Sequence, residues 1–92
     1  MRPAETLPHG TTIRPTSGGY RLHRPDRYSY GRIAVGLRKD GTGWYARCDA
    51  WDGYTWTRDR FMICPTIDQL EAAIREYAIR LDNHAHACSS PA

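Results

Sequence analysis

One stretch near the C-terminus, from Pro65 to Asn83, constrains the fold of this chain more than any other. Its apolar residues recur at helical spacing and would line one face of an amphipathic helix: Leu70, Ile74, Tyr77 and Leu81. Thr66 precedes Gln69 by three residues, which is the spacing of a capping box and predicts a helix over about 67–82. A narrow apolar stripe is not stable alone in water, so the rest of the chain must supply a surface that covers it.

The middle of the chain is expected to supply that surface as three strands. Residues 32–39 and 44–51 alternate apolar and polar side chains, as half-buried strands do, and residues 54–63 are rich in aromatic and threonine residues. The turn signals at 40–43 and 52–53 separate these segments. The sequence therefore predicts an α+β domain, a three-stranded antiparallel sheet with one C-terminal helix packed on one face. Eight sheet residues are expected to face the helix: Ile33, Val35, Leu37, Trp44, Ala46, Cys48, Phe61 and Ile63.

The flanks of this predicted domain, which spans 29–83, carry weaker signals. Residues 1–28 are rich in proline and glycine, and two interpretations remain open. Thr11–Arg14 and Tyr20–His23 could be short strands joined by a turn, or the segment could be an extended arm that holds its arginines in solvent. Composition favours the arm. Residues 84–92 show no periodicity and are expected to form a flexible tail.

Length and composition exclude several classes. Ninety-two residues make one small domain, and no apolar run is long enough to span a membrane. The N-terminus lacks the apolar region of a secretory signal, so we expect a cytoplasmic protein. Cys48, Cys64 and Cys88 are odd in number and widely spaced, which indicates reduced thiols. The formal net charge of +3 permits an acidic partner without requiring one.

The sheet face that the helix would leave uncovered carries arginines interleaved with aromatic rings. The candidate binding residues on this face are Tyr45, Arg47, Trp51, Tyr54, Trp56, Arg58 and Arg60. Stacking surfaces beside guanidinium groups are typical of sheets that bind nucleic acid. Two alternatives remain: the rings could only stabilise the sheet through cross-strand pairs, or they could anchor a protein partner. Asp49, Asp52 and Asp59 dilute the positive charge of this face.

Signatures of catalysis and metal binding are weak. His84, His86 and Cys88 form an H-x-H-x-C pattern, but a zinc site needs a fourth ligand, which Cys48 or Cys64 would have to supply through folding. The alternative is a solvated tail. The sequence contains no phosphate-binding glycine loop before a helix and no nucleophile elbow. We therefore expect no enzyme, no metal and no cofactor.

Two families resemble the segment 31–82. The first resemblance is to the AP2-type DNA-binding domain and the arm-site-binding domain of phage integrases. Their second strand carries a Gly-x-Trp-x-Ala/Val-Arg pattern, which is matched here by Trp44, Ala46 and Arg47. The start of the helix in these domains is matched by Phe61, Thr66, Glu71 and Ala72. This resemblance implies a sheet laid in the DNA major groove, with these candidate contacts: Arg38, Tyr45, Arg47, Trp56, Arg58 and Arg60. The residues 62–65 make the junction between strand and helix longer than in that family. The same segment also resembles the HicB-type antitoxin fold, which implies binding to a small RNase toxin.

The leading functional hypothesis is therefore a small accessory DNA-binding protein, of a phage-like or plasmid-like kind. The alternative is a protein-binding module, such as a HicB-like antitoxin or an inhibitor of a host protein complex, with its aromatic face buried by a partner or by self-association.

Overall fold

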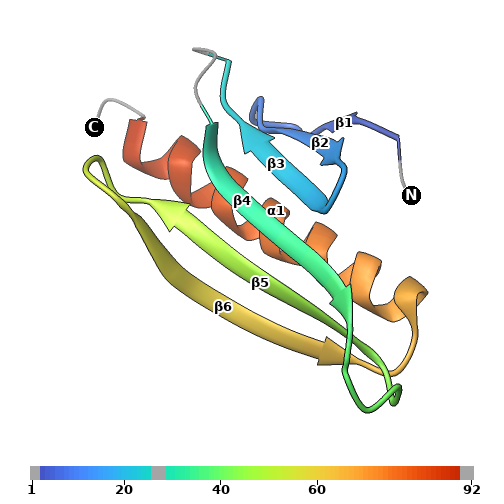
Figure 1. Ribbon diagram of the computed structural model, residues 1–92. Helices are drawn as coiled ribbons and strands as arrows, with labels where there is room; N and C mark the ends of the chain where they lie inside the picture. Colours follow the sequence, from blue (N-terminus) through green and yellow to red (C-terminus); the bar gives the residue numbers. More distant parts are fainter. Residues whose placement is uncertain (1–2, 26–28, 90–92) are drawn as a thin grey trace.

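A computed structural model of the protein describes residues 3–25 and 29–89, without the side chains of Ser29, Cys88 and Ser89. Six strands and one helix follow one another in this part of the chain: β1 (Glu5–Thr6), β2 (Thr12–Thr16), β3 (Gly19–His23), β4 (Ser29–Leu37), β5 (Trp44–Trp51), β6 (Trp56–Cys64) and α1 (Ile67–Ser89). Each strand pairs antiparallel with the next, so the strand order in the sheet equals the order in the chain (Figure 1).

The structure is α+β, but the predicted sheet of three strands is wrong, because the described sheet has six. The three additional strands come from the segment for which an arm or a hairpin was expected. Within it, Ile13, Tyr20 and Leu22 are buried in the core. Their burial offsets the cost of ordering a proline- and glycine-rich segment, which composition alone does not reveal. Residues 1–2 and 26–28 of the predicted arm lie outside the described residues.

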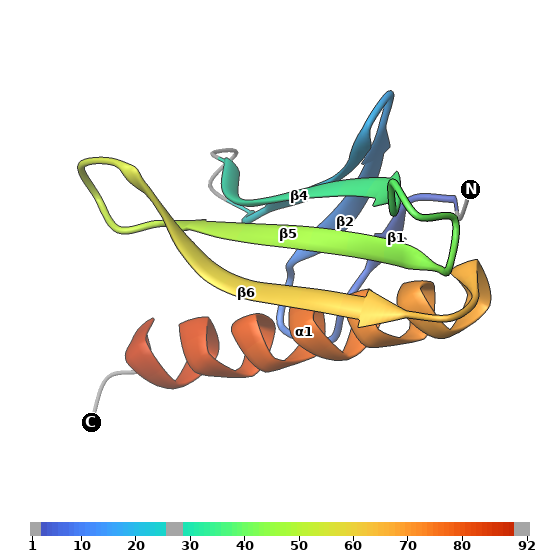
Figure 2. The same cartoon turned by 60° about the horizontal axis from the view of Figure 1, so that its bottom comes forward.

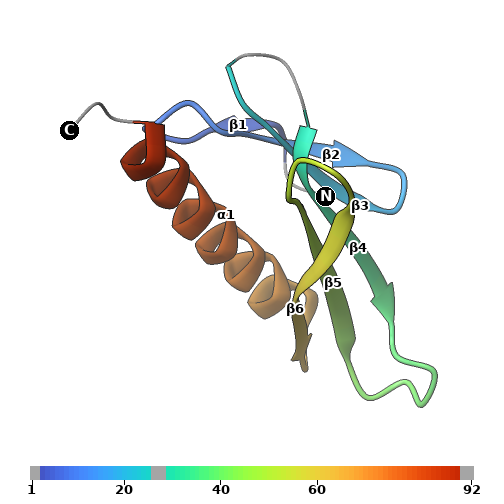
Figure 3. The same cartoon turned by 90° about the vertical axis from the view of Figure 1, so that its left-hand side faces the viewer.

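The sheet and the helix form two layers, with α1 on one face only (Figures 2 and 3). The buried core between them consists of Leu7, Ile13, Tyr20, Leu22, Ile33, Ala46, Cys48, Leu70, Ile74, Tyr77 and Ala78. The predicted cap is confirmed, because the hydroxyl of Thr66 accepts a hydrogen bond from the N–H of Gln69 at 3.2 Å. Arg75 bonds Glu5 of β1 at 2.7 Å, which ties the first strand to the helix.

The helix continues to Ser89, so residues 84–89 are helical and do not form the predicted tail; residues 90–92 lie outside the described residues. Asp82 explains why the N-terminal segment lies beside this half of the helix. Asp82 is buried, with 1% of the residue exposed. Its carboxylate accepts hydrogen bonds from the backbone N–H groups of His9 at 2.9 Å and of Thr11 at 3.0 Å. Arg24 adds an ion pair at 3.6 Å. We call these contacts of Asp82 with the N-terminal segment the Asp82 latch.

One irregularity in β6 reverses part of the predicted core. Cys48 of β5 pairs with Arg60, whereas its neighbour Asp49 pairs with Arg58, so Asp59 is an extra residue in β6. Such a bulge reverses the alternation of the side chains beyond it. Phe61 and Ile63, expected in the core, are therefore 52% and 50% exposed on the opposite face.

Leu37 also departs from the predicted core, because it is 61% exposed. It is the last residue of β4, where the chain enters the turn toward β5. Its partner across the strands, Trp44, is only partly buried. Leu37 instead lines a hollow with Tyr45 and Phe61, on the side of the sheet away from the helix.

The Asp82 latch predicts a specific loss of stability. We expect Asp82→Ala to lower the free energy of unfolding by about 2–4 kcal/mol, because two backbone N–H groups and a guanidinium lose a buried acceptor. Urea denaturation at neutral pH measures this loss. Asn83→Ala, at the exposed neighbouring position, is the control and should change the value by no more than about 0.5 kcal/mol. Equal stability of the two variants would contradict the latch.

The same latch predicts a dependence on pH. Burial raises the pKa of Asp82, but the hydrogen bonds from Thr11 and His9 outweigh burial and hold this pKa below the ordinary value of 3.8. The stabilisation is therefore complete above pH 3.8 and is lost as the pH falls through the lowered pKa. The difference in unfolding free energy between the wild type and Asp82→Asn should accordingly shrink below pH 3.8. A constant difference across that range would show that the charge of Asp82 contributes nothing.

Candidate nucleic-acid interface

The candidate site lies on the sheet face opposite α1, which we call the outer face. Ile33, Cys48 and Leu22 point toward the helix and are buried, so the residues that alternate with them point outward. The outward positions on β5 are Tyr45, Arg47, Asp49 and Trp51, as the sequence pattern predicted. Figure 3 shows that no helix covers this side of the sheet in the described part of the chain.

The strand register places four arginines and one aspartate in a single row across the outer face. Arg14 of β2 lies opposite Arg21 of β3, Arg21 lies opposite Arg32 of β4, and Arg32 lies opposite Asp49, which lies opposite Arg58 of β6. This set is called the arginine row. Like charges directly opposite one another destabilise a sheet, so the row is not explained by the stability of the fold.

Asp49 holds the middle of the arginine row together. One of its carboxylate oxygens accepts a hydrogen bond from Nε–H of Arg32 at 3.1 Å, and the other accepts one from Nε–H of Arg58 at 3.3 Å. The carboxylate is nearly buried, whereas both guanidinium groups are about half exposed. Asp49 therefore fixes the direction of two cations without neutralising the row.

Aromatic rings lie beside the row. The guanidinium of Arg32 lies 4.6 Å from the ring centroid of Trp56, and that of Arg21 lies 5.7 Å from it. Trp51 meets Trp56 edge to face at 5.5 Å between ring centroids. Toward the other end of the outer face, Tyr45 stacks on Phe61 at 5.8 Å. The cations and rings are thus held in place by one another.

A hollow of about 200 Å³ opens on the outer face beside the row. Three guanidinium-bearing residues, Arg21, Arg32 and Arg47, line it together with one carboxylate, that of Asp49. In the described part of the chain, Arg47 makes no ion pair. With three guanidinium groups and one carboxylate, the lining keeps a net positive charge, which complements that of a phosphate group.

The titration of His23 reports the positive field at one end of this face. Burial, and then the charges of Arg14 and Arg21, lower its pKa below the ordinary value of 6.5. His23 lies next to the buried Leu22 and opposite Thr12 of β2. A bound anion would act in the opposite direction and raise this pKa.

The structure brings five of the eight predicted site residues together on the outer face: Tyr45, Arg47, Trp51, Trp56 and Arg58. Arg38 and Tyr54 instead lie at the two hairpin turns, where Arg38 pairs with Asp40 at 3.5 Å and Tyr54 is 92% exposed. Arg60 lies opposite the inward-facing Cys48, on the helix side, because the bulge at Asp59 reverses its direction.

Sequence reasoning missed three residues of the arginine row, Arg14, Arg21 and Arg32. A signal was present in β3, where Arg21 and His23 alternate with Tyr20 and Leu22. Five residues of alternation are too short to distinguish a strand from an extended arm. The alignment of these arginines with Arg58 depends on strand register, which the alternation within each strand does not reveal.

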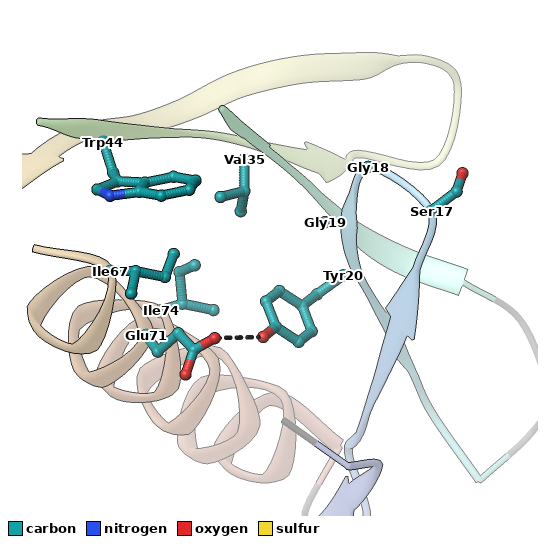
Figure 4. A pocket seen from close by; sticks show the side chains of 9 residues that line it. All are labelled: Ser17, Gly18, Gly19, Tyr20, Val35, Trp44, Ile67, Glu71 and Ile74. Atoms are coloured by element: carbon teal, nitrogen blue, oxygen red, sulfur yellow. Dashed lines mark hydrogen bonds between the residues drawn. The ribbon is translucent and has the colours of Figure 1, made fainter. Parts of the chain in front are cut away.

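A second hollow, of about 250 Å³, lies between the sheet and the first turns of α1 (Figure 4). Trp44 and Val35 line it from the sheet, and Ile67 and Ile74 line it from the helix. At its rim the hydroxyl of Tyr20 donates a hydrogen bond to Glu71 at 3.2 Å. The walls are mainly apolar, and the hollow has a single carboxylate, so its chemistry does not suggest a reaction.

Metal and thiol chemistry also find little support in the described residues. Among the side chains that the structure describes, no group of three or more histidines, cysteines or acids is arranged so that it could hold a metal ion. His86 stacks on His9, with ring centroids 4.0 Å apart, and the side chain of Cys88 lies outside the described residues. Burial raises the pKa of Cys48 to about 12, so that thiol is neutral at pH 7. No helix in the described residues is long and apolar enough to cross a membrane.

The outer face is therefore the strongest candidate site, but relatives do not identify it. Comparisons of the chain with protein-family models, with characterised proteins and with solved structures find no match, so the AP2-type and HicB-type resemblances stay predictions that rest on short motifs.

Proposed function

We propose that the protein binds DNA through its outer face, with the arginine row and Arg47 contacting phosphates. The observation that carries the proposal is the convergence of Arg21, Arg32 and Arg47 on one hollow beside the ring of Trp56. Guanidinium groups bind phosphate oxygens in pairs, and aromatic rings beside them offer stacking surfaces. Both elements occur here on one exposed surface.

The dimensions of the row are consistent with a polynucleotide. It extends from β2 to β6, across four strand spacings of about 4.8 Å each, or about 19 Å in total. At about 3.4 Å per nucleotide along a DNA strand, this length corresponds to about five or six nucleotides. A single small anion would occupy only the hollow.

The repulsion within the arginine row also favours an anionic ligand. Arg14 and Arg21 lie directly opposite each other, at a cost to the sheet that a phosphate between them would remove. Asp49 directs Arg32 and Arg58 before any ligand binds, which reduces the entropy lost on binding. Contacts of this kind position the protein on the phosphate backbone and carry no sequence information themselves.

The dependence of binding on salt tests this proposal. Affinity for a short DNA duplex should fall as salt rises, and Arg47→Ala should reduce the slope of log affinity against log salt by about 0.9. Fluorescence anisotropy measures both quantities.

Arg80→Ala is the matched control, because it removes the same charge from an exposed position on α1. It should leave both the slope and the affinity nearly unchanged. The proposal fails if the wild type does not bind at low salt, or if the two variants lose the same affinity.

His23 supplies a second test of the same face. Because its pKa lies below 6.5, its ring is mostly neutral at pH 7.5 and becomes a cation as the pH falls. DNA bound to the arginine row should raise this pKa, so affinity should increase as the pH falls through it. A histidine NMR titration with and without DNA measures the shift, and His23→Gln should remove this part of the pH dependence. An unchanged His23 titration at saturating DNA would place the DNA elsewhere.

One observation favours a second candidate, a protein-binding module. Leu37, Tyr45, Phe61 and Ile63 line a shallow, mainly apolar hollow of about 400 Å³ at one end of the outer face, with the cations Arg38 and Lys39 beside them. A protein partner seated there should lose affinity on Phe61→Ala and should respond little to Arg47→Ala, which lies outside the lining. The reverse pattern is expected for DNA, so these two variants separate the candidates.

A further inference from the structure

We propose that β6 pairs antiparallel with β6 of a second copy, so that the two sheets join into one, with Asp59 opposite Arg60 of the second copy. The outer faces of the two copies would then be continuous. This inference rests on the edge strand alone and does not depend on the proposed function.

The first observation is that β6 is an open edge. It is the last strand in the sheet order, and Figure 1 shows no element of the described chain beyond it. It is nine residues long, whereas β1 at the opposite edge has two. The unpaired N–H and C=O groups of a long edge can bind another strand. Because the sheet has only one long edge in the described residues, pairing would stop at two copies.

The second observation is the order of side chains along β6. Trp56, Arg58, Phe61 and Ile63 lie opposite outward residues of β5 and therefore point outward. Arg60 and Met62 lie opposite the buried Cys48 and Ala46, which point toward the helix. Asp59 also lies on the helix side, since it accepts the hydroxyl of Tyr77 at 2.8 Å. The bulge thus places two opposite charges, at 59 and 60, next to each other on one face.

These two faces select one register for an antiparallel pair of copies. With Asp59 opposite Arg60, the strand places Arg58 opposite Phe61 and Trp56 opposite Ile63. The two members of every facing pair then point to the same side of the joined sheet, and Asp59 of each copy lies opposite Arg60 of the other. A shift by one residue puts Arg60 opposite Arg60 and sets outward side chains against inward ones, which pairing across strands does not allow. The charge pattern is therefore complementary to itself in one register.

The bulge makes this pairing selective. An extra residue and a run of charges normally protect an edge from foreign strands. In a pair of identical copies the two bulges face each other, so neither strand is longer than the other. Phe61 and Ile63, half exposed in the single chain, would gain Arg58 and Trp56 of the second copy as neighbours.

A charge-exchange experiment by sedimentation velocity tests the proposal. The wild type should form a dimer at about 100 μM, well above the roughly 1 μM dissociation constant of a moderate complex. Asp59→Arg and Arg60→Asp should each weaken self-association at least tenfold, because like charges then face each other. An equal mixture of the two variants should form a heterodimer, because the opposite charges meet again.

The mixture decides between pairing and simple loss of structure, because Asp59 also binds Tyr77 within one chain. Arg47→Asp, with the same charge change on the neighbouring strand but away from the edge, should remain a dimer. A monomeric wild type, or a mixture that associates no better than its components, overturns the proposal.

A covalent test covers the case in which Asp59→Arg does not fold. With Cys64→Ser and Cys88→Ser as background, the double variant Arg58→Cys, Phe61→Cys should oxidise to a disulfide-linked dimer. Each of the two single variants should form much less dimer, since neither position faces its own copy. Equal yields from the single and double variants would overturn the register.

Discussion

The apolar stripe of α1 must be covered along its whole length, and this requirement organises the molecule. The stripe runs from Leu70 to Leu81, about 17 Å of a helix of 23 residues. Strands β5 and β6 lie against the helix, while the N-terminal segment contributes Leu7 and Ile13 to the same core. The Asp82 latch fixes that segment by satisfying two backbone N–H groups that would otherwise be buried without partners.

The same packing explains why the arginines gather on the outer face. Once Tyr20 and Leu22 are buried against the helix, Arg21 must point to the opposite side of β3. Pairing of β2 with β3 and of β3 with β4 then aligns Arg14, Arg21 and Arg32 in one row. The apolar residues of these strands point into the core, so the arginines that alternate with them point to the outer face. The burial of one face therefore produces a cationic surface on the other, which suits a polyanion.

The bulge at Asp59 has consequences on both faces. It moves Phe61 and Ile63 out of the expected core and places them beside Tyr45 on the outer face. It also turns Arg60 toward the helix side and brings Asp59 to the hydroxyl of Tyr77. A single extra residue therefore accounts for most of the errors in the predicted faces of β6, and for the charge pattern on which the proposed pairing of copies depends.

Local patterns in the sequence determined the start of the helix, its cap at Thr66 and the alternation of β5, because each depends on neighbours within a few residues. Five of the eight predicted site residues share the outer face for the same reason. Only the tertiary structure decided four other features: the strands of the N-terminal segment, the arginine row, the bulge at Asp59 and the Asp82 latch. Contacts such as Asp82 with Thr11 join residues far apart in the chain. Strand register depends on the geometry of each turn and on bulges such as that at Asp59, which the alternation of side chains within one strand does not reveal.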